Sequence, residues 1–432
     1  MKKVFKLFGL PLMTFAAAVF GVESCTQDVL VEVNQSSLKS GREITFYSDI
    51  ISRGVATTNA NIDSIWIYAY TKEENETGED VIPGVLFVKD KATQTFISEK
   101  KYYWPDKGTV HFKAMYPSPE KMGISTDKIF NEDPTTDSSK GIISGDTVKY
   151  LVKNKSQMIL GNYFLSGLNN GYFTSGNLAA KDIVFAEAEG SKDSNEQTGV
   201  SLNFKHALSQ VEVRVKYVGS EYVIASGGVR FKFISNVGTF DANNFVWSGL
   251  NAIKKGDFDN LASETSLNTR SNPIPLGAEP VTITTELGNR QIPGTQTGNL
   301  LIIPQKHDAW DVKADKTNER NGTVLALSLQ ILKNGKNIID FDSWSPERKE
   351  ASSVLYSAKY KYVLAAIPVE ANWEAGKKYI YTVELSDEAL GYYLPLDPDK
   401  PGEPILGNPI KIVNVTVEDW DDGDDVLLEP NE

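Results

Sequence analysis

The stretch SQVEVRVKY, which spans Ser209–Tyr217, alternates apolar and charged side chains along most of its length. Its valines fall on one face of an extended chain and its charged residues on the other: Val211, Val213 and Val215 against Glu212, Arg214 and Lys216. Successive side chains of a β-strand point to opposite faces, so this alternation predicts a strand with one buried face. The stretch therefore favours a β-sheet protein.

The same alternation returns along the whole chain. It is found in segments 110–114, 229–233, 325–331, 379–385 and 413–417. Segment 325–331 leads into Asn334-Gly335, a typical hairpin turn, and Ile65–Tyr70 is apolar on both faces and predicts a more deeply buried strand. No long amphipathic helical pattern competes with these strands. The pattern predicts an all-β chain of antiparallel β-sandwiches with Greek-key connections.

Length and composition set the scale of the fold. The chain has 432 residues, 41% hydrophobic and 23% charged, which is typical of a globular protein and not of a disordered, collagen-like or polytopic membrane chain. At about 100–200 residues per domain, this length predicts two tandem sandwich domains. The polar stretch 187–199 is interpreted as their joint, with the N-terminal sandwich at 54–198 and the C-terminal sandwich at 199–432.

Charge and motifs exclude several functions. The formal net charge of −13 argues against a nucleic-acid partner, because phosphate binding needs a basic surface. The three histidines, His111, His206 and His307, lie far apart and match no metal-ligand spacing. No nucleophile elbow, Walker A loop or dinucleotide-binding glycine motif is present. The chain is therefore not expected to be an enzyme or to hold a cofactor or a metal.

The densest acidic cluster is Glu418–Asp425, near the end of the chain. A calcium site would need the ligand order of an EF-hand loop, and Trp420 stands where a ligand is required. A charged, solvated end to the last strand fits the cluster better, and such charges would also blunt an exposed sheet edge.

The first residues have the features of an export signal. Three lysines within the first six residues precede an apolar run from Leu7 to Val22, which Pro11 interrupts and which is short for a membrane-spanning helix. Cys25, the only cysteine, follows directly after Ser24 and resembles the acylated cysteine of a bacterial lipobox. Residues 1–24 are therefore predicted to be a lipoprotein signal peptide, with Cys25 as the lipidation site. The alternative is a plain signal peptide with an incidental cysteine.

Several segments together resemble the fimbrillin family of Bacteroidales, in particular its Mfa-like branch. The most recognisable one is LNFKHALSQVEVRV, from Leu202 to Val215. The others follow in family order: Tyr103-Trp104-Pro105 with the strand Val110 to Pro117, Gly238-Thr239-Phe240 with Trp247, Leu301 to Gln305, Trp373 with Gly376 to Tyr379, and Val413 to Trp420. The resemblance extends over nearly the whole chain beyond the signal peptide.

The resemblance implies two transthyretin-like sandwiches and assembly by donor-strand exchange. In such a family a protease cuts after an arginine, the first strand is lost, and a strand from another subunit fills the open groove. Carried over here, residues 25–53 become a propeptide whose removable strand is Glu43 to Ile51, with Ile44 and Phe46 as apolar contributors. Arg53 is the preferred cleavage site and Arg42 the alternative. The donor strand would lie near 410–428, with these apolar members: Ile410, Ile412, Val413, Val415 and Val417.

The sequence therefore predicts an exported outer-membrane lipoprotein precursor that becomes a structural or accessory subunit of a cell-surface fimbria and supports adhesion. Its expected partners are other fimbrial subunits, outer-membrane lipid through Cys25, and a host or bacterial surface receptor. The alternative is a non-polymerising surface lipoprotein that binds a glycan or a protein, since exposed aromatic residues could stack on sugar rings.

Overall fold

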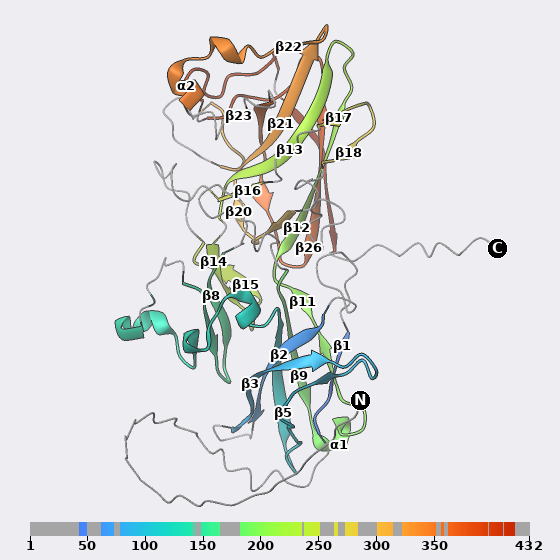
Figure 1. Ribbon diagram of the computed structural model, residues 1–432, viewed down its shortest axis with the longest axis vertical. Helices are drawn as coiled ribbons and strands as arrows, with labels where there is room; N and C mark the ends of the chain where they lie inside the picture. The colour runs from blue at the N-terminus through green and yellow to red at the C-terminus, as the bar shows by residue number, and fades with distance from the viewer. Residues whose placement is uncertain are drawn as a thin grey trace, which may run out of the picture.

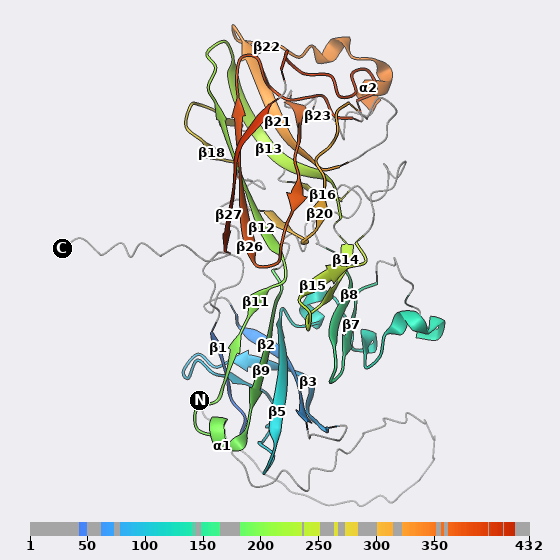
Figure 2. The same ribbon diagram turned by 180° about the vertical axis from the view of Figure 1, so that it is seen from behind.

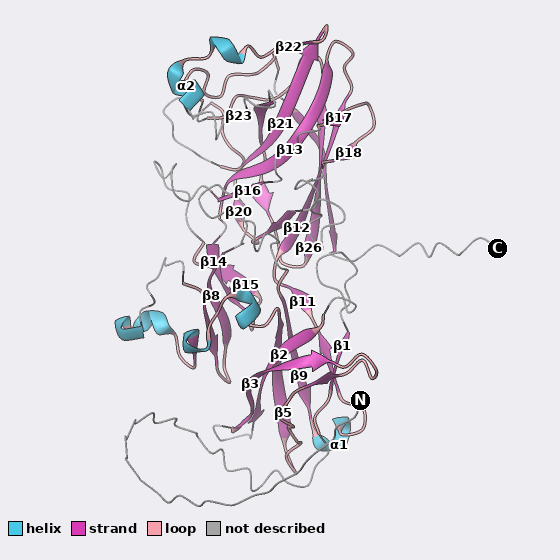
Figure 3. Ribbon diagram, viewed as in Figure 1, coloured by secondary structure: helices cyan, strands magenta, loops and turns pink. Residues whose placement is uncertain are grey.

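The computed structural model shows a chain built mainly from β-strands (Figure 3). The structure describes residues 43–49, 62–72, 78–140, 142, 148–164, 182–235, 237–250, 263–266, 273–283, 300–313, 322–350, 356–357, 362–395, 397–408 and 410–419. Helices in these ranges are short: α1 (Lys192–Asn195), α2 (Pro346–Glu350) and single 3-10 turns at Glu120–Met122, Thr126–Lys128, Pro134–Thr136, Ser138–Lys140 and Phe341–Ser343. The prediction of an all-β fold is confirmed.

Two sheets occupy the half of the molecule drawn at the bottom of Figure 1. Within the described residues, the first sheet has the strand order β10 (Val200–Asn203), β1 (Phe46–Asp49), β4 (Phe96–Ile97), β3 (Asp80–Lys89), β2 (Ser64–Lys72), β5 (Thr109–Tyr116), β9 (Val184–Gly190) and β11 (Lys205–His206). The second sheet has the order β15 (Val246–Ser248), β14 (Val237–Asp241), β8 (Met158–Phe164), β7 (Tyr150–Lys153) and β6 (Ile129–Phe130).

Two further sheets form the other half. The third sheet has the order β18 (Val281–Thr282), β12 (Ser209–Tyr217), β26 (Lys377–Leu385) and β27 (Lys411–Asp419), with β19 (Leu300–Ile302) also paired to β12. The fourth has the order β16 (Ser263–Ser266), β13 (Val223–Ile234), β21 (Val324–Lys333), β24 (Tyr362–Pro368) and β23 (Tyr356–Ser357), with β17 (Ile274–Pro275) on β13 and β22 (Lys336–Asn337) on β21. A short pair joins β20 (Lys306–His307) to β25 (Ala371–Asn372).

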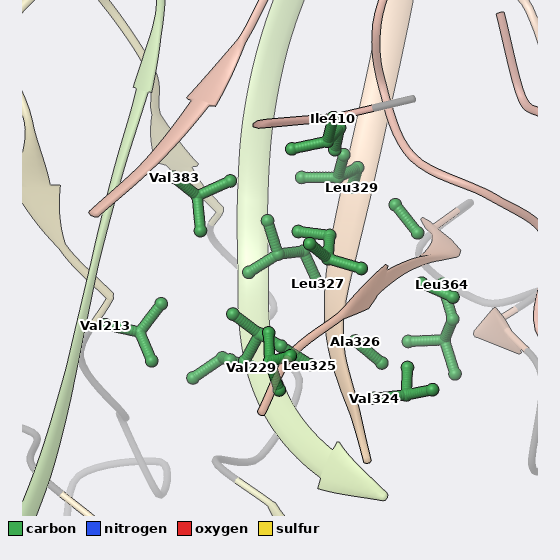
Figure 4. Close-up of a cluster of buried hydrophobic side chains, with 14 of the residues drawn as sticks. Val213, Val229, Val324, Leu325, Ala326, Leu327, Leu329, Leu364, Val383 and Ile410 are labelled. Carbon is green, nitrogen blue, oxygen red and sulfur yellow. The ribbon is translucent and has the colours of Figure 1, made fainter. Parts of the chain in front are cut away.

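Of the hydrophobic clusters in the described residues, the largest lies between the third and fourth sheets. Val213 and Val383 reach into it from the third sheet, and Val229, Leu327 and Leu364 reach into it from the fourth (Figure 4). Because both sheets point alternating apolar residues inward, this half has the layered arrangement of a β-sandwich. The turn predicted at Asn334-Gly335 connects β21 to β22, and both residues have positive φ (53° and 77°), as such a hairpin turn requires.

The first sheet carries a core on each of its faces. On one face Phe46, Ile67, Phe112 and Ala186 belong to a cluster formed by the first sheet and its connections. On the other face another cluster joins this sheet to the second sheet through Trp66, Met115, Phe185, Leu160 and Phe240. The strands of the first sheet are therefore covered on both sides along part of their length.

The polar stretch 187–199 lies inside the first half of the molecule. It contains the end of β9 and α1, and the strands on both of its sides, β9 and β10, belong to the first sheet. The chain reaches the third sheet only at β12, and β14 and β15 then return to pair beside β8. The chain thus passes between the two halves more than once. The domain boundaries expected from the sequence stay a prediction.

Candidate functional site

Strand β1 is held in the first sheet by two buried apolar side chains. Ile44 is 2% exposed, and Phe46 is fully buried in the core. The Phe46 ring contacts Phe87 and Phe112 edge-on, with centroid distances of 5.1 and 5.3 Å. Both residues were predicted as the apolar contributors of the first strand, and the structure places both in the core. Much of what holds β1 is therefore hydrophobic.

The backbone of β1 has one long partner and one short partner. It pairs in parallel with β10 over Phe46–Asp49, whereas its antiparallel pairing with β4 consists of the single pair Phe46 and Phe96. Before the strand, the Ile44 N–H donates to the Tyr102 carbonyl at 2.8 Å. Among the described residues, the backbone of β1 is therefore held mainly by β10, and the residues before it by a bridge between Glu43 and Tyr103 and an ion pair between Glu43 and Lys101.

The predicted processing residues lie outside the described residues. They are the predicted lipidation site, Cys25, and the two candidate cleavage sites, Arg53 and Arg42. Of the strand predicted at 43–51, the described part is 43–49, and the observed strand is Phe46–Asp49.

Strand β27 forms an edge of the third sheet beside β26 (Figure 2). Val415 and Val417 pair directly with Tyr381 and Tyr379, so they share the face that those tyrosines bury in the core. The two valines are nevertheless 44% and 54% exposed. Among the described residues β27 has one neighbouring strand, and its apolar face is only partly covered.

The other predicted members of the donor segment differ in burial. Ile410 is 8% exposed and packs into the same core as Leu329 (Figure 4). Ile412 and Val413 belong to β27, but their side chains lie outside the description. The acidic cluster 418–425 extends past the last described residue, Asp419.

A buried ion pair fixes the chain ahead of β27. Both Nε and Nη2 of Arg348 donate to one carboxylate oxygen of Asp397, at 2.9 and 2.5 Å, and both side chains are 4% exposed. The guanidinium lies over the Trp344 ring at 3.7 Å and over the Tyr393 ring at 4.8 Å. Farther along, the Asn408 N–H donates to the Glu388 carbonyl at 2.8 Å. The chain before β27 is thus anchored without any contribution from β27 itself.

The Glu212 side chain on β12 contacts residues of two neighbouring strands, β18 and β26, and β26 is the strand that pairs with β27. Its carboxylate accepts hydrogen bonds from Arg214 and Thr282, both at 2.7 Å, and lies 3.0 Å from the Lys378 ammonium on β26. Burial opposes ionisation of Glu212, but these hydrogen bonds and the charge of Lys378 outweigh burial and lower its pKa from 4.5 to about 2. The carboxylate is therefore ionised in the folded protein over the whole neutral range.

We expect Glu212→Gln to destabilise the protein in a pH-dependent way. Because the pKa of Glu212 is lower in the folded state, its contribution is fully present above pH 4.5 and is lost as the pH falls toward 2. The loss at pH 7 is on the order of 3 kcal/mol. Urea unfolding of wild type and variant at pH 7 and pH 3 measures it. A difference between the two proteins that does not shrink at pH 3 contradicts the assignment.

The three histidines do not converge. His111 pairs with Glu189 at 2.9 Å, His206 with buried Asp182 at 2.6 Å, and His307 with Gln305 at 2.9 Å. Burial lowers the pKa of His307. Within the described ranges no three His, Cys, Asp or Glu side chains are grouped closely enough to hold a metal ion. No helix in these ranges is both long and apolar enough to cross a bilayer.

Solved structures similar to this chain include fimbrial proteins of Bacteroides and Parabacteroides species. A fimbrial protein from Bacteroides vulgatus is 13% identical, with 87% of this chain and 99% of that chain covered and a TM-score of 0.46. A fimbrial assembly protein from Parabacteroides distasonis is 9% identical, with 80% and 92% covered and a TM-score of 0.32. No curated protein sequence matches significantly. A family model described as fimbrillin-like matches residues 52–420. The chain therefore belongs to the fimbrillin-like family.

Proposed function

We propose that this protein is a structural or accessory subunit of a cell-surface fimbria, assembled by protease-triggered donor-strand exchange. Membership of a family of fimbrial subunits, not of enzymes, supports the first part of this proposal. The observation that carries the second part is the position of β1, a short strand near the start of the described chain. Its Phe46, together with Ile44 just before the strand, lies in the core of the first sheet.

Removal of β1 would create an acceptor groove. The aromatic side chains that now surround Phe46, among them Phe87 and Phe112, would face an open space, and β10 would lose its parallel partner. Each exposed large apolar side chain costs about 1.5–3 kcal/mol, and unpaired backbone groups add to that cost. An extended segment with apolar residues at alternate positions would satisfy both needs at once.

The contacts of β27 support its role as the donor. An edge strand with one described neighbour can leave its sheet by breaking one ladder of hydrogen bonds. Val415 and Val417 lie two residues apart and are half exposed, so they would gain burial in a complete groove. Because the chain is anchored up to Asn408, the donor segment would begin at about Ile410. Extraction of Ile410 from its present core opposes the exchange.

The cell-surface route completes the proposal. Export with a signal peptide of residues 1–24 and acylation at Cys25 would tether the precursor to the outer membrane. Cleavage after Arg53 would then remove both the lipid and the first strand. Adhesion through a host or bacterial receptor would be a property of the assembled fimbria.

Limited treatment with an arginine-specific protease tests the proposal. We expect a ladder of heat-sensitive oligomers whose chains begin at Gly54, and no ladder from an Arg53→Gln variant. Ladder formation should also be blocked by deleting residues 410–432 from a cleavable chain. A chain that is cut after Arg53 yet stays monomeric at high concentration contradicts strand exchange. That result would favour a surface lipoprotein that binds a glycan or a protein without polymerising.

A further inference from the structure

A lysine, an asparagine and a glutamate meet at a pocket on the face of the first sheet that turns toward the second sheet. Lys113 lies on β5 and Glu187 lies opposite it on β9. Asn243 belongs to the turn between β14 and β15 (Figure 1). The Lys113 Nζ is 3.3 Å from the Asn243 Oδ1 and 3.8 Å from a Glu187 carboxylate oxygen. Nothing in strand exchange uses this group.

Burial makes the Lys113 ammonium less stable than that of a lysine in water. The side chain is 4% exposed, and burial lowers its pKa against the opposing charges of Glu187 and Asp241. A neutral amine is a nucleophile, whereas an ammonium is not. The Glu187 side chain is 51% exposed and is the charged group within reach of Nζ that can take up its proton.

The Asn243 amide is held and polarised. Its Oδ1 accepts from the Met158 backbone N–H at 2.8 Å in addition to Lys113, and its Nδ2 donates to the Ser156 carbonyl at 3.1 Å. The Met158 N–H on the carbonyl oxygen would stabilise the negative charge that develops there when Lys113 adds to the carbon. The Lys113 Nζ is held 3.3 Å from Oδ1, the atom bonded to the Cγ that it would attack, so the two groups that would react already lie side by side.

We propose that Lys113 and Asn243 become joined by an intramolecular isopeptide bond, with Glu187 as the proton carrier. Glu187 accepts a proton from the Lys113 ammonium, and the free Nζ adds to the Asn243 Cγ. The bond from Cγ to Nδ2 then breaks as Glu187 passes its proton to the leaving nitrogen, and ammonia departs through the open side of the pocket. Glu187 takes up the second proton that Nζ must lose to become an amide nitrogen, and releases it to water. One C–N bond replaces another, so the reaction needs no oxidant, reductant or cofactor.

This proposal goes beyond the fimbrial role and stands independently of it. The bond would join β5 of the first sheet to the β14–β15 turn of the second sheet, across a sequence separation of 130 residues. In a fibre under tension, the chain between the two linked residues would be shielded from extension. In an unassembled chain, the bond would still restrict unfolding of both sheets.

Peptide mass spectrometry of the full chain isolated from cells tests the bond. We expect a branched peptide that contains Lys113 and Asn243, with a mass about 17 Da below the sum of the two separate peptides, the mass of one ammonia. Trypsin should fail to cut after Lys113, because its amine is acylated. Recovery of both residues in separate unmodified peptides from the wild-type chain overturns the proposal.

Matched variants test the part assigned to Glu187. Glu187→Gln should leave both residues unlinked while the protein stays folded, because half of that side chain is in solvent. Glu189→Gln, two residues further on the same strand, should keep the branched peptide, because Glu189 contacts His111 and not Lys113. Lys113→Arg should abolish it. A branched peptide that persists in Glu187→Gln contradicts the mechanism, and a 17 Da loss confined to an Asn243 peptide contradicts the bond.

Discussion

Phe46→Ala is expected to lower the free energy of unfolding of the first sheet by about 3–5 kcal/mol. The Phe46 ring is fully buried, and it contacts two aromatic rings edge-on, so alanine leaves a cavity that strands at both sides cannot close without moving. Urea unfolding followed by tryptophan fluorescence measures the change, because Trp104 lies in the same core. After cleavage, the weakened strand should also leave sooner, so oligomers should form faster.

Tyr47→Ala is the matched control for this effect. Tyr47 is the next residue on β1 and is 38% exposed, so its loss should change stability far less. Equal unfolding midpoints for the two variants would show that β1 is not held by its buried face. That outcome would also remove the argument that the vacated groove needs a donor.

Asp397→Ala is expected to cost about 3–5 kcal/mol, since it leaves the Arg348 guanidinium buried without its counter-ion. Both Arg348 hydrogen bonds to Asp397 would be lost, and the stacked Trp344 and Tyr393 rings cannot replace a carboxylate. Thermal unfolding measures the loss. The effect should be greatest in the half that contains β27, because Asp397 lies in the segment that leads into this strand.

Asp399→Ala provides the comparison for this pair. Asp399 lies 3.9 Å from the Arg348 Nη1 and its side chain is 31% exposed, so water can replace it as a partner. If Asp399→Ala destabilises the protein as much as Asp397→Ala, the buried pair is not the anchor of this segment. Arg348→Ala combined with Asp397→Ala should be milder than Asp397→Ala alone, because no buried charge then remains unpaired.

Side-chain alternation was sufficient to predict the apolar faces of the central strands. Val211, Val213 and Val215 are buried in the core of the third and fourth sheets, as their spacing indicated. The period of a strand is a local property, so it can be recognised without knowledge of which strands become neighbours. The same holds for Ile44 and Phe46, which were expected to contribute apolar contacts and lie in the core of the first sheet.

The opposite faces of these strands could not be predicted in the same way. Glu212 and Lys113 were expected on polar faces, yet they are 5% and 3% exposed. Lys113 is covered because the turn containing Asn243, 130 residues away in sequence, packs over β5. Glu212 is covered by contacts with Thr282 and Lys378 on neighbouring strands. Burial on this scale depends on long-range pairing, which a local pattern does not encode.

Near the end of the chain, residues with the alternation of a core strand are instead exposed. Val415 and Val417 alternate like core residues, but they remain half exposed because β27 lies at the edge of its sheet.

The buried ion pair between Arg348 and Asp397 could not be predicted from a local pattern. The two residues are separated by 49 residues, and each is an ordinary charged residue in a polar stretch. Only the folded chain brings them together.

The N-terminal residue of chains taken from assembled fimbriae on the cell surface tests the central claim most directly. Strand exchange after cleavage at Arg53 predicts that these chains begin at Gly54 and lack Ile44 and Phe46. Chains that begin at Cys25, or at Glu43 after cleavage at Arg42, would retain the first strand. Either of those results, found in the polymer itself, would contradict the account.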